Sequence, residues 1–141
     1  MFDAIRTALS GLLAAQNRVA AVATNVANES DVSRTTPQAG DPPVFQPIDT
    51  VETSTAGGVI SRFTPRQPAT VTVPDGSSPL ADSRGLVNLP NVDLGTEFVN
   101  VIEAKTSFAA NAKVIETAAK MEKTLISTVG GGGKNHVKID V

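Results

Sequence analysis

Apolar residues recur in steps of three and four along the first 30 positions of the chain. This spacing places them on one face of a helix, at the a and d positions of a heptad repeat. Many of the other positions are alanine, which favours helix and lets a neighbouring element approach closely. We therefore predict a helix over about residues 3–28, with a seam formed by Phe2, Ile5, Leu9, Leu12, Gln16, Val19, Ala23 and Val26.

The last third of the chain repeats this pattern. Asp93 or Thr96 can cap the start of a second helix, and Gly130 is expected to stop it. The prediction is a helix over about residues 95–128, with a seam formed by Leu94, Phe98, Val101, Lys105, Phe108, Ala112, Ile115 and Ala119.

The nine prolines all lie between Pro37 and Pro90, so both flanks can be helical and the middle cannot. Within the middle, Ile48–Thr53 and Val59–Phe63 flank a Gly-containing turn and predict a hairpin, and Ala69–Val73 predicts a third strand. The fold class is α+β. Its parts are a helix within 1–30, a loop and small β module in 31–92, a helix within 93–129 and a flexible Gly-rich tail in 130–141.

Two heptad helices in one chain can pair with each other as a coiled-coil-like bundle, parallel or antiparallel. One interpretation is an intramolecular helical hairpin that carries a small β module. The other is that spare apolar surface on these helices packs against neighbouring subunits, which can build an open helical polymer. The periodicity alone leaves both open.

Composition excludes several functional classes. The net charge is -2, from 12 basic and 14 acidic residues, so no basic stripe for nucleic acid is expected. The chain has no cysteine and a single histidine, and no constellation of nucleophile, base and metal ligands is visible. We predict no enzyme activity, no cofactor, no metal and no small-molecule substrate. The N-terminus lacks a basic leading region and no stretch approaches a membrane span, so neither a cleaved signal peptide nor direct membrane insertion is expected.

Short motifs at both ends carry a family resemblance. Ala8-Leu9-Ser10-Gly11-Leu12, then Ala15-Gln16 and Asn25-Val26-Ala27-Asn28, resemble the N-terminal signature of flagellar rod, hook and hook-associated axial proteins. Asn91-Val92-Asp93-Leu94, Glu97-Phe98 and Ala109 to Ile115 resemble the matching C-terminal signature. Residues 84–92 are similar to a stretch of proximal rod proteins. The chain is thus identified as a member of the flagellar basal-body rod protein family.

The resemblance implies a structural subunit of the bacterial flagellar basal-body rod, the shaft that crosses the periplasm and transmits torque. The implied partners are other copies of itself, other flagellar rod proteins and the flagellar type III export apparatus, through which such proteins pass unfolded without a cleaved signal. The alternative is a non-polymerising adaptor or an orphan paralogue that binds another axial protein and stays monomeric or dimeric.

The candidate subunit-interface residues combine the helix seams with the signature positions. They are Ile5, Leu9, Leu12, Gln16, Val19, Asn25, Asn28, Asn91, Leu94, Phe98, Val101, Phe108, Asn111 and Ile115. Two alternatives accompany this set. Asn25 and Asn28 can serve as helix-end residues instead, and Gln16 either fixes register in the seam or is exposed. The charges Arg6, Arg18 and Lys105 are either solvated or paired with Glu97, Glu103 or Glu116 of a neighbour.

Overall fold

The computed structural model describes residues 2–42 and 44–131. Along the chain, one helix is followed by four strands and then by a second helix, as the α+β prediction expects. The elements are α1 (Phe2–Ala27), β1 (Ile48–Thr55), β2 (Gly58–Pro65), β3 (Thr70–Pro74), β4 (Leu86–Pro90) and α2 (Leu94–Gly131).

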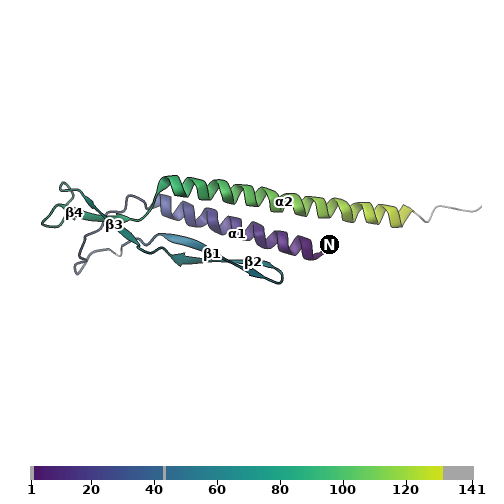
Figure 1. Ribbon diagram of the computed structural model, residues 1–141, viewed down its shortest axis with the longest axis horizontal. Coiled ribbons are helices and arrows are strands. Elements are labelled where there is room, and N and C mark those ends of the chain that lie inside the picture. Colours follow the sequence, from purple (N-terminus) through teal and green to yellow (C-terminus); the bar gives the residue numbers. More distant parts are fainter. Residues whose placement is uncertain (1, 43, 132–141) are drawn as a thin grey trace, which may run out of the picture.

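The molecule is elongated, and α1 lies between two neighbours (Figure 1). On one side α2 runs antiparallel to it, and on another the hairpin of β1 and β2 lies along it. The β3–β4 pair sits beyond the end where α1 stops and α2 begins. Because α2 has 38 residues and α1 has 26, α2 extends well past the N-terminus of α1.

Both helices begin and end close to the predicted positions. Asp93 is the N-cap of α2, since its Oδ1 accepts a hydrogen bond of 2.6 Å from the backbone N–H of Thr96. The predicted stop at Gly130 is wrong, because α2 continues to Gly131. Glycine weakens a helix but does not forbid it, so a helix can run through the first glycines of a tract. The rest of the predicted linker, with His136, lies outside the described residues.

Two antiparallel strand pairs make up the middle of the chain. In the hairpin, Ile48 pairs with Pro65 and Thr55 with Gly58, so β1 is two residues longer than predicted and β2 three residues longer. The predicted third strand pairs with β4, where Val73 lies opposite Val87. The strand β4 was not predicted from the sequence, because it ends in a proline and has only five residues.

The interior is built from small side chains. The buried apolar residues are Ala8, Ala14, Ala15, Ala21, Val22, Val87, Ala104 and Ala118, none larger than valine. Most phenylalanine, leucine and isoleucine side chains of the helices are exposed instead, among them Phe2, Leu9, Leu13, Phe98, Ile102 and Phe108. Small residues on the inner face of α1 let a helix and a hairpin approach it together. The large residues are therefore left outside.

Candidate assembly surface

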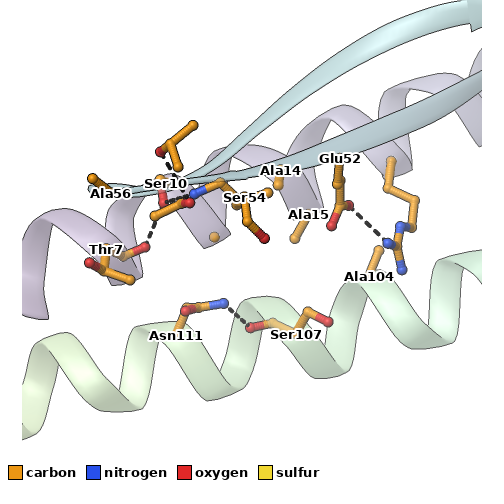
Figure 2. Close-up of a pocket in the computed structure, with 15 residues that line it drawn as sticks. Thr7, Ser10, Ala14, Ala15, Glu52, Ser54, Ala56, Ala104, Ser107 and Asn111 are labelled. Carbon is orange, nitrogen blue, oxygen red and sulfur yellow. Dashed lines mark hydrogen bonds and ion pairs between the residues drawn. The ribbon is translucent and has the colours of Figure 1, made fainter.

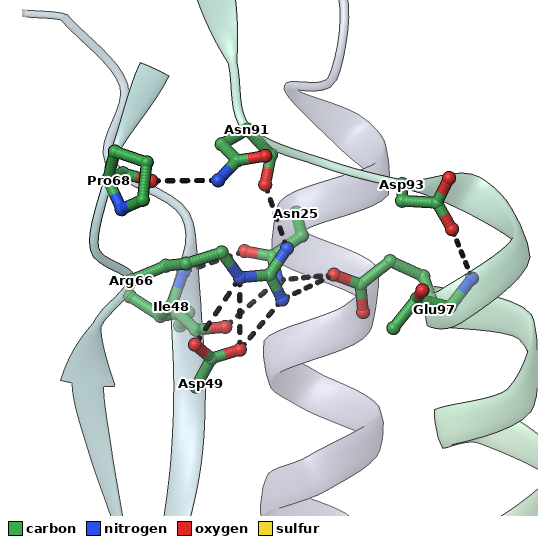
Figure 3. Close-up of polar contacts among 9 residues, drawn as sticks. Asn25, Ile48, Asp49, Arg66, Pro68, Asn91, Asp93 and Glu97 are labelled. Atoms are coloured by element: carbon green, nitrogen blue, oxygen red, sulfur yellow. Dashed lines mark hydrogen bonds and ion pairs between the residues drawn. The ribbon is translucent and has the colours of Figure 1, made fainter. Parts of the chain in front are cut away.

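Five polar residues meet at the end of α1, the open end of the β1–β2 hairpin and the start of α2 (Figure 3). This polar junction consists of Asn25, Asp49, Arg66, Asn91 and Glu97. Asn25 and Glu97 are each only 1% exposed, which makes them the buried polar residues of the described chain. A buried polar group must be hydrogen-bonded to be tolerated, so the partners of these two residues decide what the junction does.

Arg66, just after β2, is the centre of the junction. Its Nη2 lies 2.7 Å from Asp49 Oδ1 and 2.8 Å from Glu97 Oε1, and its Nη1 donates to the carbonyl oxygen of Asn91 over 2.9 Å. The hydrogen bond to Asp49 raises the pKa of Arg66 above its ordinary value, and partial burial opposes that effect. One guanidinium thus joins β1, the start of α2 and the segment before it, in the forked geometry that only arginine provides.

Asn25 connects α1 to the same junction. Its side-chain amide donates to the carbonyl oxygen of Ile48 and its Oδ1 accepts from the Ile48 N–H, both over 2.9 Å. The same amide also donates to Glu97 Oε1 over 3.0 Å. The side chain therefore pairs with Ile48 as a neighbouring strand would, and it fixes where the hairpin begins relative to the end of α1.

Two glycines, Gly11 and Gly58, fix the packing at the opposite end of α1. A Cβ atom on Gly11 would lie 2.5 Å from Asn111 Nδ2 on α2, and one on Gly58 would clash with Ser10 Oγ on α1. Gly58 also has φ of +127°, a conformation that L side chains rarely adopt. Ser10 Oγ accepts a 3.0 Å hydrogen bond from the Val59 N–H. Both close contacts require glycine, and they set the distances of α2 and the hairpin from α1.

Between these two ends lies a hollow of about 520 Å³, lined by α1, the hairpin and α2 (Figure 2). Its walls are mostly alanine, glycine, serine and threonine. The charged residues in the lining are Arg18 and Glu52, which form an ion pair with 2.8 Å between Nη2 and Oε1. The described residues contain no group of three histidine, cysteine, aspartate or glutamate side chains that could hold a metal ion. The hollow has no arrangement of groups that suits a catalytic reaction.

The apolar surface of the helices gathers into a groove at the junction end. This apolar groove is lined by α1 and α2 alone and has a volume of about 350 Å³. Its lining residues are Val19, Val22, Ala23, Val26, Leu94, Glu97, Phe98 and Val101. Glu97 is the only polar residue among them, and its carboxylate is engaged by Arg66.

A second apolar surface lies at the other end of the molecule, on the turns of α2 that pass beyond α1. Ala118 is the last buried residue of α2, and we call residues 119–131 the overhang. Its large apolar side chains are Met121, Leu125, Ile126 and Val129, all more than half exposed.

The predicted seams do not form the contact between α1 and α2. On α1, Leu9, Gln16, Val19, Ala23 and Val26 are exposed, and Ile5 and Leu12 are half-buried. The buried stripe is Ala8, Ala15 and Val22, one position away from the predicted seam. The reason is that alanine packs closer than leucine between two neighbours, so steric fit outweighs hydrophobicity in choosing the inner face.

On α2 the predicted seam coincides with the inner face only in part. Val101, Ala112 and Ile115 are half-buried, whereas Leu94, Phe98, Lys105, Phe108 and Ala119 are exposed. The fully buried positions, Glu97, Ala104 and Ala118, lie beside the predicted ones.

The signature asparagines all make hydrogen bonds within the chain. Asn28 donates to the carbonyl oxygen of Thr24, Asn91 to that of Pro68 and Asn111 to that of Ser107. Asn28 and Asn111 thus bond to the helical backbone four residues before them, whereas Asn25 and Asn91 join different parts of the chain. The role of Asn25 and Asn28 in contacts with a neighbouring subunit stays a prediction.

The charges also find partners inside the chain. Arg18 pairs with both Glu52 and Glu103, and Arg6 pairs with Asp3. Glu116 pairs with Lys113 and Lys120, and these hydrogen bonds lower the pKa of Glu116. Arg66 was missed in the sequence, because it belongs to no motif. The available signal was the set of polar residues at element ends, Asn25, Asp49 and Glu97, which need a common partner.

Comparison with known proteins agrees with both ends of this architecture. The family described as flagellar basal body rod FlgEFG protein C-terminal matches residues 83–128, which include β4 and most of α2. The flagellar basal-body rod protein FlgC of Aquifex aeolicus is 36% identical over 114 residues, which cover 80% of this chain and 85% of that protein. The chain belongs to the FlgC family of flagellar basal-body rod proteins. FlgC of Salmonella typhimurium is 34% identical, over 79% of this chain and 85% of that protein. FlgC of Yersinia enterocolitica is 34% identical, over 89% of this chain and 93% of that protein.

Membership of the FlgC family settles the broad class. The family consists of structural rod proteins and not of enzymes, as the composition predicts. The resemblance found in the two signatures is confirmed. Within the part of the chain that the structure describes, neither helix is long and apolar enough to cross a membrane.

Proposed function

We propose that this chain is a structural subunit of the flagellar basal-body rod, and that it polymerises through its terminal helices into the torque-transmitting axial shaft. The observation that carries the proposal is the reversed distribution of side-chain size. Alanine and valine are buried within the subunit, while the large apolar side chains of both helices face outward. Contiguous exposed apolar surface of this kind marks a contact with another macromolecule.

The extent of this surface favours assembly over an isolated subunit. Phe98 is 69% exposed and Ile102 is 62% exposed, so burying such side chains between subunits would contribute about 1.5–3 kcal/mol each. The buried alanines contribute much less per residue. Most of the apolar area that could still be buried therefore lies on the surface. Only contact with neighbouring subunits can bury it.

The helices are the elements through which neighbours would meet. The seam residues Leu9, Val19, Val26, Leu94 and Phe98 are exposed on them. In a coiled-coil-like bundle of several subunits, these seams would face the helices of other copies and of other rod proteins. Asn25 would support this indirectly, because it joins α1 to Glu97 in the first turn of α2.

The same interior suits passage through the flagellar type III export apparatus, which we include in the proposal. A core of alanine and valine buries little apolar surface, so the isolated fold has only marginal stability. A chain that must travel unfolded and fold at its destination benefits from such low stability. Assembly would then add the missing stability.

Co-purification with basal bodies tests the proposal. An epitope tag would be inserted between Gly76 and Ser77, in the exposed turn between β3 and β4 and far from both helices. Intact hook–basal bodies would be extracted with detergent and probed for the tag, and a deletion strain would be scored for motility and filaments. A rod subunit gives tag in the particles and a non-motile deletion without filaments. A motile deletion with no tag in the particles would replace the rod role by the adaptor or orphan paralogue.

A further inference from the structure

We infer that residues 136–141 of a second copy of this chain bind as an added strand along the free edge of β1, over the space between the hairpin and α2. We call this edge, from residue 49 to residue 54, the strand slot. The inference rests on the proposed function, because the second copy would be a neighbour in the polymer. The slot belongs to the space inside the subunit and is separate from the outer faces of the two helices.

The strand slot has open backbone groups. Just before it, the N–H and the carbonyl of Ile48 both turn to this edge, where the Asn25 side chain binds them. In an antiparallel pair, every second residue turns these groups to the same edge, so Thr50, Glu52 and Ser54 present theirs there as well. Within residues 2–42 and 44–131, the edge-facing groups of these three residues have no hydrogen-bond partner. Asn25 thus binds the first position as a neighbouring strand would, and the next positions are open.

There is room for a strand beside this edge. Among the described elements, the hairpin and α2 both pack on α1 but not on each other. The hollow of about 520 Å³ lies between Ser54 of β1 and Asn111 of α2 (Figure 2). A second hollow of about 300 Å³, lined in part by Thr50, continues it on the other side of Arg18. Because Glu52 reaches Arg18 from the inner face of the hairpin, a strand in the plane of the hairpin would pass over this ion pair and cover both hollows.

Residues 136–141 have the sequence pattern of such a strand. Polar and β-branched apolar residues alternate strictly in this segment, which consists of His136, Val137, Lys138, Ile139, Asp140 and Val141. Alternation with period two indicates a strand with one polar and one apolar face. Six residues span about 20 Å as a strand, which is also the length of the slot. The segment can therefore pair with the whole edge by strand addition.

An antiparallel register matches the side chains on both faces. With Lys138 opposite Glu52, cross-strand pairing places Ile139 opposite Val51. Glu52 lies on the face of β1 that turns to Arg18, whereas Val51, which is 51% exposed, lies on the opposite face. The charged face of the segment then meets the ionic groups beneath it, and its apolar face covers Val51. A shift by one residue would exchange the two faces and lose both matches.

The segment of the same copy cannot reach the slot. Asn111 is the last residue of α2 that lines the larger hollow, and from there to residue 131 the helix spans about 30 Å. The chain from residue 131 to residue 136 spans at most about 18 Å when fully extended. The segment of one copy must therefore enter the slot of another. Such a contact joins two different surfaces and can repeat from copy to copy.

Peptide binding to the full-length chain tests the contact. The probe is a fluorescent peptide of residues 134–141, titrated with dilute protein and followed by anisotropy. The expected result is saturable binding. Val51→Lys in the protein and Ile139→Asp in the peptide should each weaken binding about fivefold, because each places a charge beside an apolar partner. The two changes together should restore most of the affinity, since the new charges then pair across the strands.

Two variants of one residue test the backbone of the edge. Thr50→Pro removes an N–H that faces the slot and leaves the bonds between β1 and β2 in place, so peptide binding should fall about tenfold. Thr50→Ala keeps this N–H and is the matched control. Circular dichroism would check the fold of both variants, and the Val51→Lys measurements decide the matter without Thr50→Pro if that variant unfolds.

The outcomes separate this inference from the proposed function. Absence of binding, or equal binding of a peptide in which Lys138 and Ile139 are exchanged, would overturn it. Tighter peptide binding by full-length Ile139→Asp protein than by the parent would also overturn it, because the segment would then occupy the slot of its own copy. The rod role stands after any of these results if the tagged parent enters basal bodies. Absence of the tagged parent from basal bodies would contradict the rod role itself.

Discussion

The polar junction and the outer faces of the helices reverse the usual arrangement of a small protein. At the junction, Asn25 and Glu97 are buried and hydrogen-bonded to each other, and the half-buried Arg66 donates to Glu97. On the outer faces, phenylalanine, leucine and valine lie in contact with solvent. The two regions therefore have different roles. The interior determines how the elements are placed through directional bonds, while the surface holds the apolar area that assembly can bury.

The largest effect is expected from removing the central cation of the junction. Arg66→Ala leaves Glu97 buried without its charged partner, so the free energy of unfolding should fall by about 3 kcal/mol. Urea unfolding followed by circular dichroism would measure it. Arg62→Ala is the control, because Arg62 is an exposed arginine of β2, four residues before Arg66. Equal losses in the two variants would mean that the junction has no special role.

The next effect concerns the close contact between the hairpin and α1. Gly58→Ala adds a Cβ that clashes with Ser10 and forces alanine to a positive φ, so we expect a loss of about 2 kcal/mol in the free energy of unfolding. Gly57→Ala in the same turn is the control. Its Cβ would approach only the mobile end of Arg6, at 3.4 Å, so thermal unfolding should change little. A similar loss at both positions would contradict the contact.

A third prediction separates folding from assembly at the surface. Phe98→Ser should change the free energy of unfolding of the isolated subunit by no more than about 0.5 kcal/mol, because the ring is mostly exposed. The same variant should be lost from isolated basal bodies and should fail to restore motility. Val71→Ser, at an exposed position of β3, is expected to remain motile. A Phe98→Ser variant that assembles normally would remove the groove from the assembly surface.

The smallest effect is a dependence on pH at the start of α2. The hydrogen bond from the backbone N–H of Thr96 lowers the pKa of Asp93, and a hydrogen bond with the Thr96 hydroxyl lowers it further. A lowered folded-state pKa means that the contribution of Asp93 is present above the unfolded value and is lost as pH falls through the folded value. Melting temperatures compared between neutral pH and about pH 3 should therefore fall less in Asp93→Asn than in the parent, because asparagine caps without titrating. An unchanged acid response would show that this cap contributes nothing measurable.

The sequence predicts where the helices and strands lie along the chain better than it predicts which side of each helix is buried. The absence of proline in both flanks, the Gly turn after Ser54 and the cap at Asp93 identify the helices and the hairpin, because each is a local effect. Heptad spacing did not identify the face of α1 that is buried within the subunit, since it ranks Leu9 above Ala8 whereas packing between two neighbours selects the smaller residue. The strand β4 and the role of Arg66 depend on partners distant in sequence, and no local pattern encodes them.

The close contacts at Gly11 and Gly58 have a mechanical consequence. Both are on the same stretch of α1, where α2 and the hairpin tip meet it from different sides. A helix held at two points around its circumference resists rotation about its own axis. A sideways load on the outer face of α1 is therefore passed directly to α2 and to the hairpin. We therefore expect the subunit to twist as one stiff unit, with little sliding among α1, α2 and the hairpin.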